Sequence, residues 1–300
     1  MTTSETRTAA VDDSRLQRPA RMRSIHVGEL RVTYVPDGAV GLEPRGWLPD
    51  ATDKEWAAHA DHLDEHGKLP AGIGGLLVEY GERALLIDAG IGPIAEPDDP
   101  GNTLIGAIGG GALLENLALT GRTPDRIEAV AFTHLHTDHI GWAHHPAPGT
   151  DAPAFTGAEY LVAEQEWDQR HLAAHGVTPE MLTTMAPRVR TIRDGDEIFP
   201  GVRVVEIPGH TAGHTGFAIA SGEQRLLAFG DALHSPLQIR YPHWTSGADH
   251  DIAAAIDGRR RLVDELAATG DPAFGIHFAD VAFGTVARAA DGSTRWAPLP

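Results

Sequence analysis

The sequence contains no cysteine, and it has fewer basic than acidic residues. Without cysteine the chain cannot form disulfides, thiolate zinc sites, iron–sulfur clusters or a cysteine nucleophile, so any metal must be held by nitrogen and oxygen. The 24 Lys and Arg residues against 42 Asp and Glu give a formal net charge of -18. Such a charge repels phosphate backbones and anionic lipid, so we expect neither nucleic-acid partners nor binding to a membrane surface.

Long apolar runs are also missing. No stretch approaches the length of a membrane span, and the first residues lack the apolar core of a secretory signal, so a cytoplasmic protein is expected. No serine lies in a Gly-x-Ser-x-Gly segment, so the sequence lacks the nucleophile elbow on which a serine hydrolase of that type depends. The glycines of residues 106–111 have no phosphate-loop lysine beside them, which disfavours a phosphate cradle.

What is present is enough apolar sequence for a sizeable core, 42% of 300 residues. Residues 1–24 are polar and lack periodicity, so they are predicted to be a flexible N-terminal arm, and residues 25–300 to form one domain. Leu30–Val35 alternates as a half-buried strand does, and Gly74–Tyr80 with Arg83–Asp88 predicts a hairpin. Strand groups alternate with helical segments, which is typical of an α/β protein with sheets inside and helices outside.

Three histidines and an aspartate fall within His134–His139, directly after a predicted buried strand at Ile127–Phe132. His134 and His136 can point to the same side if the backbone stays extended, which leaves Asp138 and His139 free to face a second ion. Imidazole and carboxylate suit zinc, and they also accept iron, manganese or cobalt. The alternative is a surface loop that happens to be rich in histidine.

Further strand ends favour the metal site over that alternative. Three more apolar strands are followed by a histidine or a carboxylate: Val202–Ile207 by His210, Arg225–Phe229 by Asp231, and the strand from Phe274 by His277. Ligand-type side chains at several strand ends can meet at one edge of a sheet. The candidate ligands are His134, His136, Asp138, His139, His210, Asp231 and His277.

These segments resemble the metallo-β-lactamase-fold hydrolases. That family carries THxHxDHxG, then Pro-Gly-His-Thr-x-Gly-His, then Gly-Asp at a strand end, then a late histidine, and all four occur here in that order within residues 133–277. The resemblance implies a four-layer αββα sandwich with two divalent ions, zinc being the expected metal. By position, the first ion would be bound by His134, His136 and His210, the second by Asp138, His139 and His277, and Asp231 would bridge them.

The same resemblance implies hydrolysis of a lactone or a small carboxylic ester by a hydroxide that bridges the ions. The expected catalytic residues are Asp138, Asp231 and His234. The chain is similar to the branch of N-acyl homoserine lactonases and methyl parathion hydrolase, but many lactonases have tyrosine where this chain has His234. His234 is expected to orient substrate or protonate a leaving group, or else to pack beside the site. An organophosphate triester hydrolase and a non-catalytic metal-binding module are the alternatives.

An apolar pocket wall is predicted from Trp142, Phe278 and Phe283, because each lies close to a candidate ligand in sequence. Such a wall favours a small neutral or apolar ester or lactone as substrate. Residues 40–70 and 89–112 are candidates for a lid. His214 is predicted to brace its loop, and His59 and His62, which lack a spacing partner, to be surface residues. The substrate, the metal and the oligomeric state stay open, a homodimer included.

Overall fold

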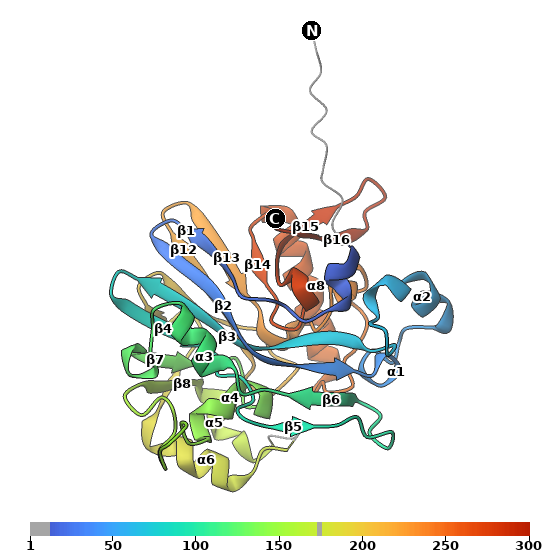
Figure 1. Cartoon of the computed structure of the whole chain (residues 1–300). Coiled ribbons are helices and arrows are strands. Elements are labelled where there is room, and N and C mark those ends of the chain that lie inside the picture. The colour runs from blue at the N-terminus through green and yellow to red at the C-terminus, as the bar shows by residue number, and fades with distance from the viewer. Residues whose placement is uncertain (1–12, 173–175) are drawn as a thin grey trace.

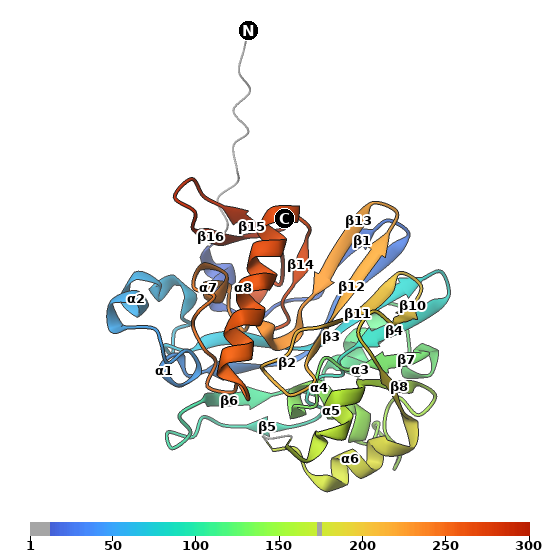
Figure 2. The same ribbon diagram turned by 180° about the vertical axis from the view of Figure 1, so that it is seen from behind.

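The protein, here a computed structural model that describes residues 13–172 and 176–300, is built in four layers (Figures 1 and 2). Two β-sheets face each other in the middle, and helices cover the outer face of each. This is the αββα arrangement that the sequence predicts. Among the described residues no helix has both the length and the apolar character needed to cross a membrane.

The first sheet contains nine of the strands in the described residues, in the order β5-β6-β2-β3-β4-β7-β8-β9, with β1 paired to β2. It is antiparallel from β5 to β4 and parallel from β4 to β9. The β3–β4 hairpin is the predicted one. The strands are β1 (Arg23–Val27), β2 (Leu30–Leu42), β3 (Leu69–Tyr80), β4 (Arg83–Ile87), β5 (Ala95–Glu96), β6 (Ile105–Gly109), β7 (Ala129–Ala131), β8 (Glu159–Ala163) and β9 (Val189–Ile192).

The second sheet contains seven strands of the described chain in sequence order, β10 to β16. Only its β13–β14 pair is parallel, because α8 and the segments around it cross over between those two strands. The strands are β10 (Glu197–Phe199), β11 (Val202–Glu206), β12 (Thr215–Ser221), β13 (Gln224–Ala228), β14 (Ala273–Phe274), β15 (Phe283–Arg288) and β16 (Thr294–Pro298).

The α-helices begin and end at clear sequence signals. Thr52 caps α2 with a capping box, since its hydroxyl accepts from the Glu55 N–H and Glu55 accepts from the Thr52 N–H. Gly270, at a φ of 71°, ends the longest helix. The α-helices are α1 (Pro44–Trp47), α2 (Asp53–Ala58), α3 (Leu113–Leu119), α4 (Thr137–His144), α5 (Glu164–Asp168), α6 (Pro179–Met185), α7 (Pro236–Arg240) and α8 (Ile252–Thr269).

The main core lies between the two sheets and follows from strand alternation. In β11, Val202 and Val204 are buried between the sheets while Arg203 is exposed on the outer face. The outer face of the first sheet packs against α3, α4 and α6, and that of the second against α7 and α8. Because both sheets are sandwiched, the loops at their edges are held by rigid elements on both sides.

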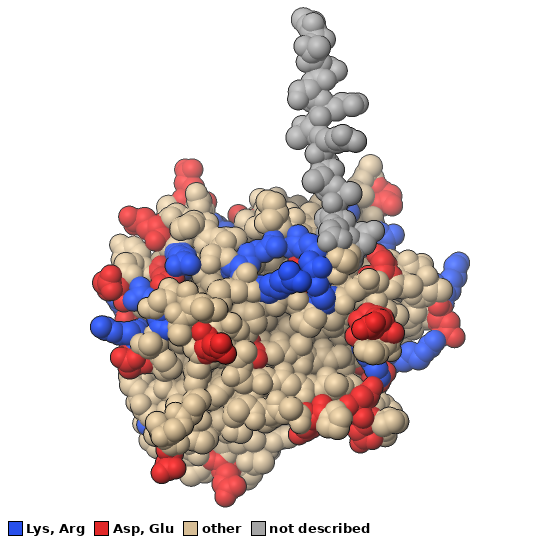
Figure 3. All heavy atoms as spheres, in the orientation of Figure 1, with Lys and Arg blue, Asp and Glu red and all other residues tan. Residues whose placement is uncertain are grey.

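The predicted N-terminal arm is described only from residue 13, and that part is attached to the domain. Asp13–Gln17 forms a short 3-10 helix, η1, and β1 already begins at Arg23. Arg15 Nε donates to the Asp280 carbonyl at 2.8 Å, and Arg18 Nε to its carboxylate at 2.9 Å. The packed domain therefore begins earlier than the predicted residue 25. Basic side chains gather near η1 on the face that Figure 3 shows, whereas acidic side chains are scattered over that face.

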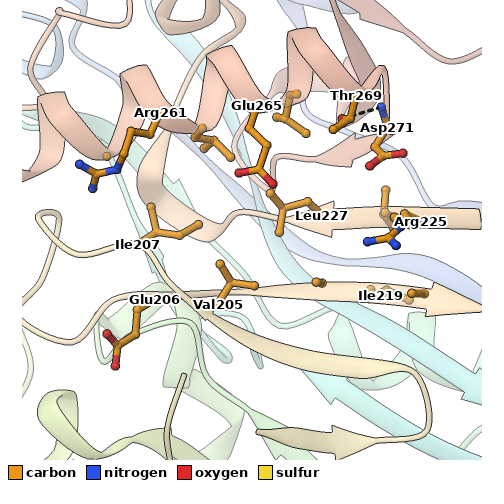
Figure 4. A pocket seen from close by; sticks show the side chains of 16 residues that line it. Val205, Glu206, Ile207, Ile219, Arg225, Leu227, Arg261, Glu265, Thr269 and Asp271 are labelled. Atoms are coloured by element: carbon orange, nitrogen blue, oxygen red, sulfur yellow. Dashed lines mark hydrogen bonds between the residues drawn. The ribbon is translucent and has the colours of Figure 1, made fainter. Parts of the chain in front are cut away.

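A groove lies between α8 and the outer face of the second sheet (Figure 4). Its floor is formed by Val205, Ile207 and Leu227, and its rim carries charges of both signs, including Arg261 and Glu265. The residues that line it include no histidine. The chemistry expected from the sequence therefore has to lie elsewhere.

Candidate metal centre

All seven predicted ligands meet at one edge of the sandwich. The segment after β7 carries His134 and His136, and α4 begins there, which places Asp138 and His139 in its first turn. His210 lies between β11 and β12, Asp231 follows β13, and His277 follows β14. Each ligand thus sits just after a buried strand, as the motif positions predict. Six of the seven are buried, and the Asp138 side chain is 22% exposed.

The first group surrounds one oxygen of Asp231. His134 Nε2 lies 2.9 Å from His136 Nδ1, which in turn lies 3.1 Å from His210 Nε2. Asp231 Oδ2 completes the group at 3.5 Å from His210 Nε2 and 3.8 Å from His134 Nε2. The ligand atoms of these four residues all lie within 4.8 Å of one another.

The second group lies on the other side of Asp231. His139 Nε2 is 3.3 Å from Asp231 Oδ1, and His277 Nε2 is 3.2 Å from Asp231 Oδ2. Asp138 Oδ2 lies 3.6 Å from both imidazole nitrogens. Since Asp231 contacts both groups, it stands where the sequence resemblance places a bridging carboxylate.

The ring nitrogens that point away from Asp231 have their own partners. His139 Nδ1 bonds Asp88 Oδ2 at 3.0 Å, and His277 Nδ1 donates to the Gly72 carbonyl at 2.8 Å. His210 Nδ1 faces Asp249 Oδ1 at 3.4 Å. Such outer partners fix the ring orientation and the tautomer, so that Nε2 is the atom presented to the centre.

This arrangement fits divalent ions. Ligands about 2.0–2.1 Å from a tetrahedral zinc ion lie roughly 3.3–3.4 Å from one another, which matches the spacings described above. His139 Nε2 and Asp231 Oδ1 are buried without a hydrogen-bond partner among the described residues. Buried polar atoms left unpaired are costly, and a cation between them satisfies both. The site is therefore a His/Asp metal-binding site.

Burial and the neighbouring charged groups together set the pKa values of the histidines in the centre. Burial, with the neighbouring His139 and His136, lowers the pKa of His134 well below its usual value and favours the neutral, cation-binding imidazole. Burial by itself would also lower the pKa of His139, but Asp231, Asp138 and Asp88 outweigh it and raise that pKa. The carboxylates thus make this pocket attractive to positive charge.

His234 is close to the centre but in a different position from the ligands. Its Nε2 is 3.2 Å from Asp231 Oδ2, and its ring stacks on His277 with centroids 5.6 Å apart. Burial, partly opposed by Asp231, lowers its pKa to about 4. Neither cavity beside the metal centre has His234 among its lining residues. His214 bonds the Ile207 carbonyl and the Asp231 N–H, which is the predicted bracing role.

The sequence prediction missed the carboxylates that support the ligands. Asp88 directly follows β4, has a φ of 60°, accepts from the Thr133 N–H at 2.8 Å and bonds His139. A positive φ is uncommon outside glycine, and aspartate tolerates it better than most residues. The sequence signal was the Asp-Ala-Gly that directly follows an apolar strand.

Glu166 in α5 is the second missed carboxylate, and it joins two ligand loops. Its Oε1 accepts from the Leu135 N–H at 3.0 Å, between His134 and His136. Its Oε2 accepts from the Thr211 hydroxyl at 2.7 Å and the Gly213 N–H at 2.8 Å, just after His210. Glu166 is only 5% exposed and has no basic partner in the described chain. Only the folded structure brings α5 to these loops.

Asp249 and Arg259 form a third support. Arg259, from α8, is 1% exposed and donates from Nη2 to Asp249 Oδ2 at 2.8 Å, while Asp249 Oδ1 faces His210. Burial alone would raise the pKa of Asp249, but the bond to His210 and the Arg259 charge hold it well below its usual range. The pair therefore keeps a carboxylate behind His210.

Replacing Arg259 with leucine should weaken ion binding in the first group about 10–100-fold, because Asp249 would be left as an uncompensated buried charge that no longer orients His210. Zinc titration of metal-free protein measures this. Arg260→Leu is the matched control, since Arg260 is the next residue of α8 and its side chain is 55% exposed. Equal zinc affinity in the two variants would contradict the role given to Arg259.

Two cavities open beside the centre, and they differ in character. One is walled by apolar residues and has Asp138, Asp231 and His277 at its floor. The other is polar and includes Gln169, Arg170 and Thr211. His136 and Ala248 line both, so the cavities meet at the ligands. The apolar wall comprises Val40 and Leu42 of β2, Trp47 of α1, and Leu104, Ile105 and Ile108 in and beside β6.

The predicted wall of Trp142, Phe278 and Phe283 is wrong, because these three rings are buried in the hydrophobic cores. Trp142 Nε1 instead donates to Asp37 at 2.9 Å. Nearness in sequence to a ligand did not place these side chains in the pocket, since each points into a layer behind the loop. The observed apolar wall comes from parts of the predicted lid segments, namely from residues 40–47 within 40–70 and from residues 104–108 within 89–112.

Comparison with known proteins agrees with this geometry. Residues 76–281 match the family described as the metallo-beta-lactamase superfamily. The fold is similar to that of AidC, a dizinc quorum-quenching lactonase solved with a product, with a TM-score of 0.79 and 23% identity over 95% of this chain and 98% of that one.

Two further solved structures share the fold. The hydrolase AbOPH has a TM-score of 0.76 at 23% identity, covering 94% of this chain and 98% of its own. AiiA from B. thuringiensis, a mutant with N-decanoyl-L-homoserine bound at the active site, has a TM-score of 0.64 at 21% identity, covering 85% and 94%. At these identities the likeness establishes the common fold.

Proposed function

The chain belongs to the metallo-beta-lactamase superfamily and is a metal-dependent hydrolase, and from that premise we propose that it binds two divalent ions, zinc first among them, and hydrolyses a lactone or a small carboxylic ester. One observation carries the proposal. Seven ligand-type side chains, Asp231 among them, gather in two adjacent groups beside an apolar-walled cavity. A non-catalytic metal-binding site does not require a cavity of this kind beside its ligands.

Two ions held by the His/Asp centre would supply a hydroxide nucleophile at neutral pH and would polarise the substrate oxygen. The chain holds the substrate. Val40, Leu42 and Ile108 bury an apolar substituent of the substrate. His136 lines both cavities, and the scissile bond therefore lies next to it. The polar cavity with Gln169 and Arg170 then accepts the polar end of an ester or the opened lactone. Asp138, at the cavity floor, faces the reacting group.

His234 is assigned a positioning role. It contacts Asp231 and His277 but lines neither of the two cavities described beside the centre, so it acts through those two residues rather than on the substrate. Gly230, Asp231 and His234 form a Gly-Asp-x-x-His segment that resembles methyl parathion hydrolase, and this resemblance favours an organophosphate triester as the second candidate substrate of the same site. Both substrates are neutral esters that suit the apolar wall.

Elemental analysis of purified protein, followed by a panel of acyl lactones, aryl esters and phosphotriesters, tests the proposal. We expect about two ions per chain at the His/Asp centre, turnover of lactones or carboxylic esters, and loss of turnover after chelation that zinc restores. Preferential turnover of the phosphotriester selects the second candidate. Full activity in metal-stripped protein, or no turnover across the panel in metal-loaded protein, would overturn the hydrolase mechanism.

Trp47 provides a test of the apolar wall. Its ring lines the cavity and meets His234 edge-on at 5.2 Å, and its buried indole Nε1 has no hydrogen-bond partner in the described chain. Trp47→Ala should raise KM about tenfold or more for substrates with an apolar substituent, because it removes buried contact area. Trp47→Phe keeps the ring but loses the N–H. A KM that rises for both variants alike identifies a donor role, whereas a rise for alanine alone identifies apolar contact.

A further inference from the structure

A second cluster of ligand-type side chains lies away from the metal centre, on the segment that follows α2. His59 is the C-cap of α2, and Asp61 and His62 lie in the short 3-10 helix η2 (Ala60–His62). One ligand atom from each of these three residues lies within 4.8 Å of the others. The sequence prediction treated His59 and His62 as unrelated surface histidines, and the structure corrects this.

We propose that His59, Asp61 and His62 form an independent mononuclear site for a divalent transition ion such as zinc. Two imidazoles and a carboxylate are a common ligand set for such ions, and solvent can supply the remaining positions. Ligands of a tetrahedral ion stand roughly 3.3–3.4 Å apart, so atoms that lie within 4.8 Å of one another need to close by at most about 1.5 Å. Asp61 is exposed and the two histidines are half-buried, so side-chain rotation can provide this.

The surroundings leave these groups available to a metal. The side chains of Asp61 and His62 make no hydrogen bond or ion pair within the part of the chain that the structure describes. His59 Nε2 lies 3.0 Å from the Tyr241 hydroxyl, and its ring meets His62 edge-on with centroids 5.9 Å apart. A partner on one ring nitrogen is the usual way in which a ligand histidine is oriented.

Burial also disfavours the protonated form of both imidazoles. Burial is the main cause that lowers the pKa of His62 to about 4, and burial likewise lowers the pKa of His59. Neutral imidazole is the ligand form, so burial acts in the direction that favours cation binding. His66, a few residues on, is a contrast, because its side chain is 76% exposed and near only Glu65.

Zinc stoichiometry tests the proposal. Metal-free full-length protein is equilibrated with zinc, freed of unbound ions and analysed for zinc per chain. We expect three ions in the parent, two in His62→Ala and in Asp61→Asn, and three in the His66→Ala control. Equal zinc content in the parent and both site variants would overturn the inference. Hydrolysis by the two site variants should stay at the parent level, since neither residue touches the catalytic centre.

The counts also separate this inference from the proposed function. A parent with two ions, unchanged in His62→Ala, contradicts the new site and leaves the dinuclear centre standing. A parent with one ion, lost in His62→Ala, supports the new site and contradicts the dinuclear centre. Asp231→Asn protein gives a second measurement, because it should retain one ion and lose that ion when His62→Ala is added.

Discussion

Asp231→Asn protein should lose both ions of the catalytic centre and at least about a thousandfold in kcat/KM. The reason is that Asp231 is the residue shared by the two ligand groups, with His139 on Oδ1 and His277, His210 and His134 around Oδ2. Asparagine keeps the shape but removes the negative charge that holds two cations side by side. Losing several kcal/mol of transition-state stabilisation corresponds to this factor in rate.

The readouts for Asp231→Asn are zinc content and thermal unfolding as well as turnover. A ligand at about 100 times its dissociation constant stabilises a folded protein by about 2.7 kcal/mol per site. The parent should show this stabilisation by zinc at the catalytic centre, and the variant should not. Asp257→Asn is the control, because Asp257 lies on α8 and its side chain is 66% exposed. A variant that still carries both ions would contradict the bridging role.

The ligands of the centre could be predicted from sequence because their pattern is local. His134 to His139 follow one strand, and each remaining ligand follows another, so an apolar run with a polar residue behind it marks each position. The layered fold followed for a similar reason, since alternation within strands such as β11 fixes which face is buried. Local patterns of this kind do not depend on which distant segment packs against them.

The supporting residues and the pocket wall could not be predicted in the same way. Asp249 and Arg259 look like ordinary surface charges in the sequence, and only the position of α8 buries them behind His210. The wall residues come from β2, α1 and β6, and they meet only because β6 pairs with β2. Trp142 was predicted in the pocket wall because it is close to His139 in sequence. That closeness does not determine which side of α4 the ring occupies, and the ring is buried in the core.

Glu166→Ala should lower the free energy of unfolding by about 3–5 kcal/mol, because three buried donors on two ligand loops lose their acceptor together. Those donors are the N–H groups of Leu135 and Gly213 and the hydroxyl of Thr211. Chemical denaturation of metal-free protein measures the change. Glu164→Ala is the matched control on the same helix, since Glu164 forms a surface pair with Arg193 and should cost no more than about 1 kcal/mol.

The conservative variant Glu166→Gln separates a positioning role from a purely structural one. Glutamine fills the same space and keeps one acceptor, so it can bind one ligand loop but turns an amide N–H toward the donors of the other. If Glu166 sets the distance between the His134–His136 segment and His210, zinc affinity should fall about 10–100-fold even where the variant stays folded. Unchanged zinc affinity in folded Glu166→Gln would mean that α5 supports the fold alone and that the ligand loops hold their spacing without it.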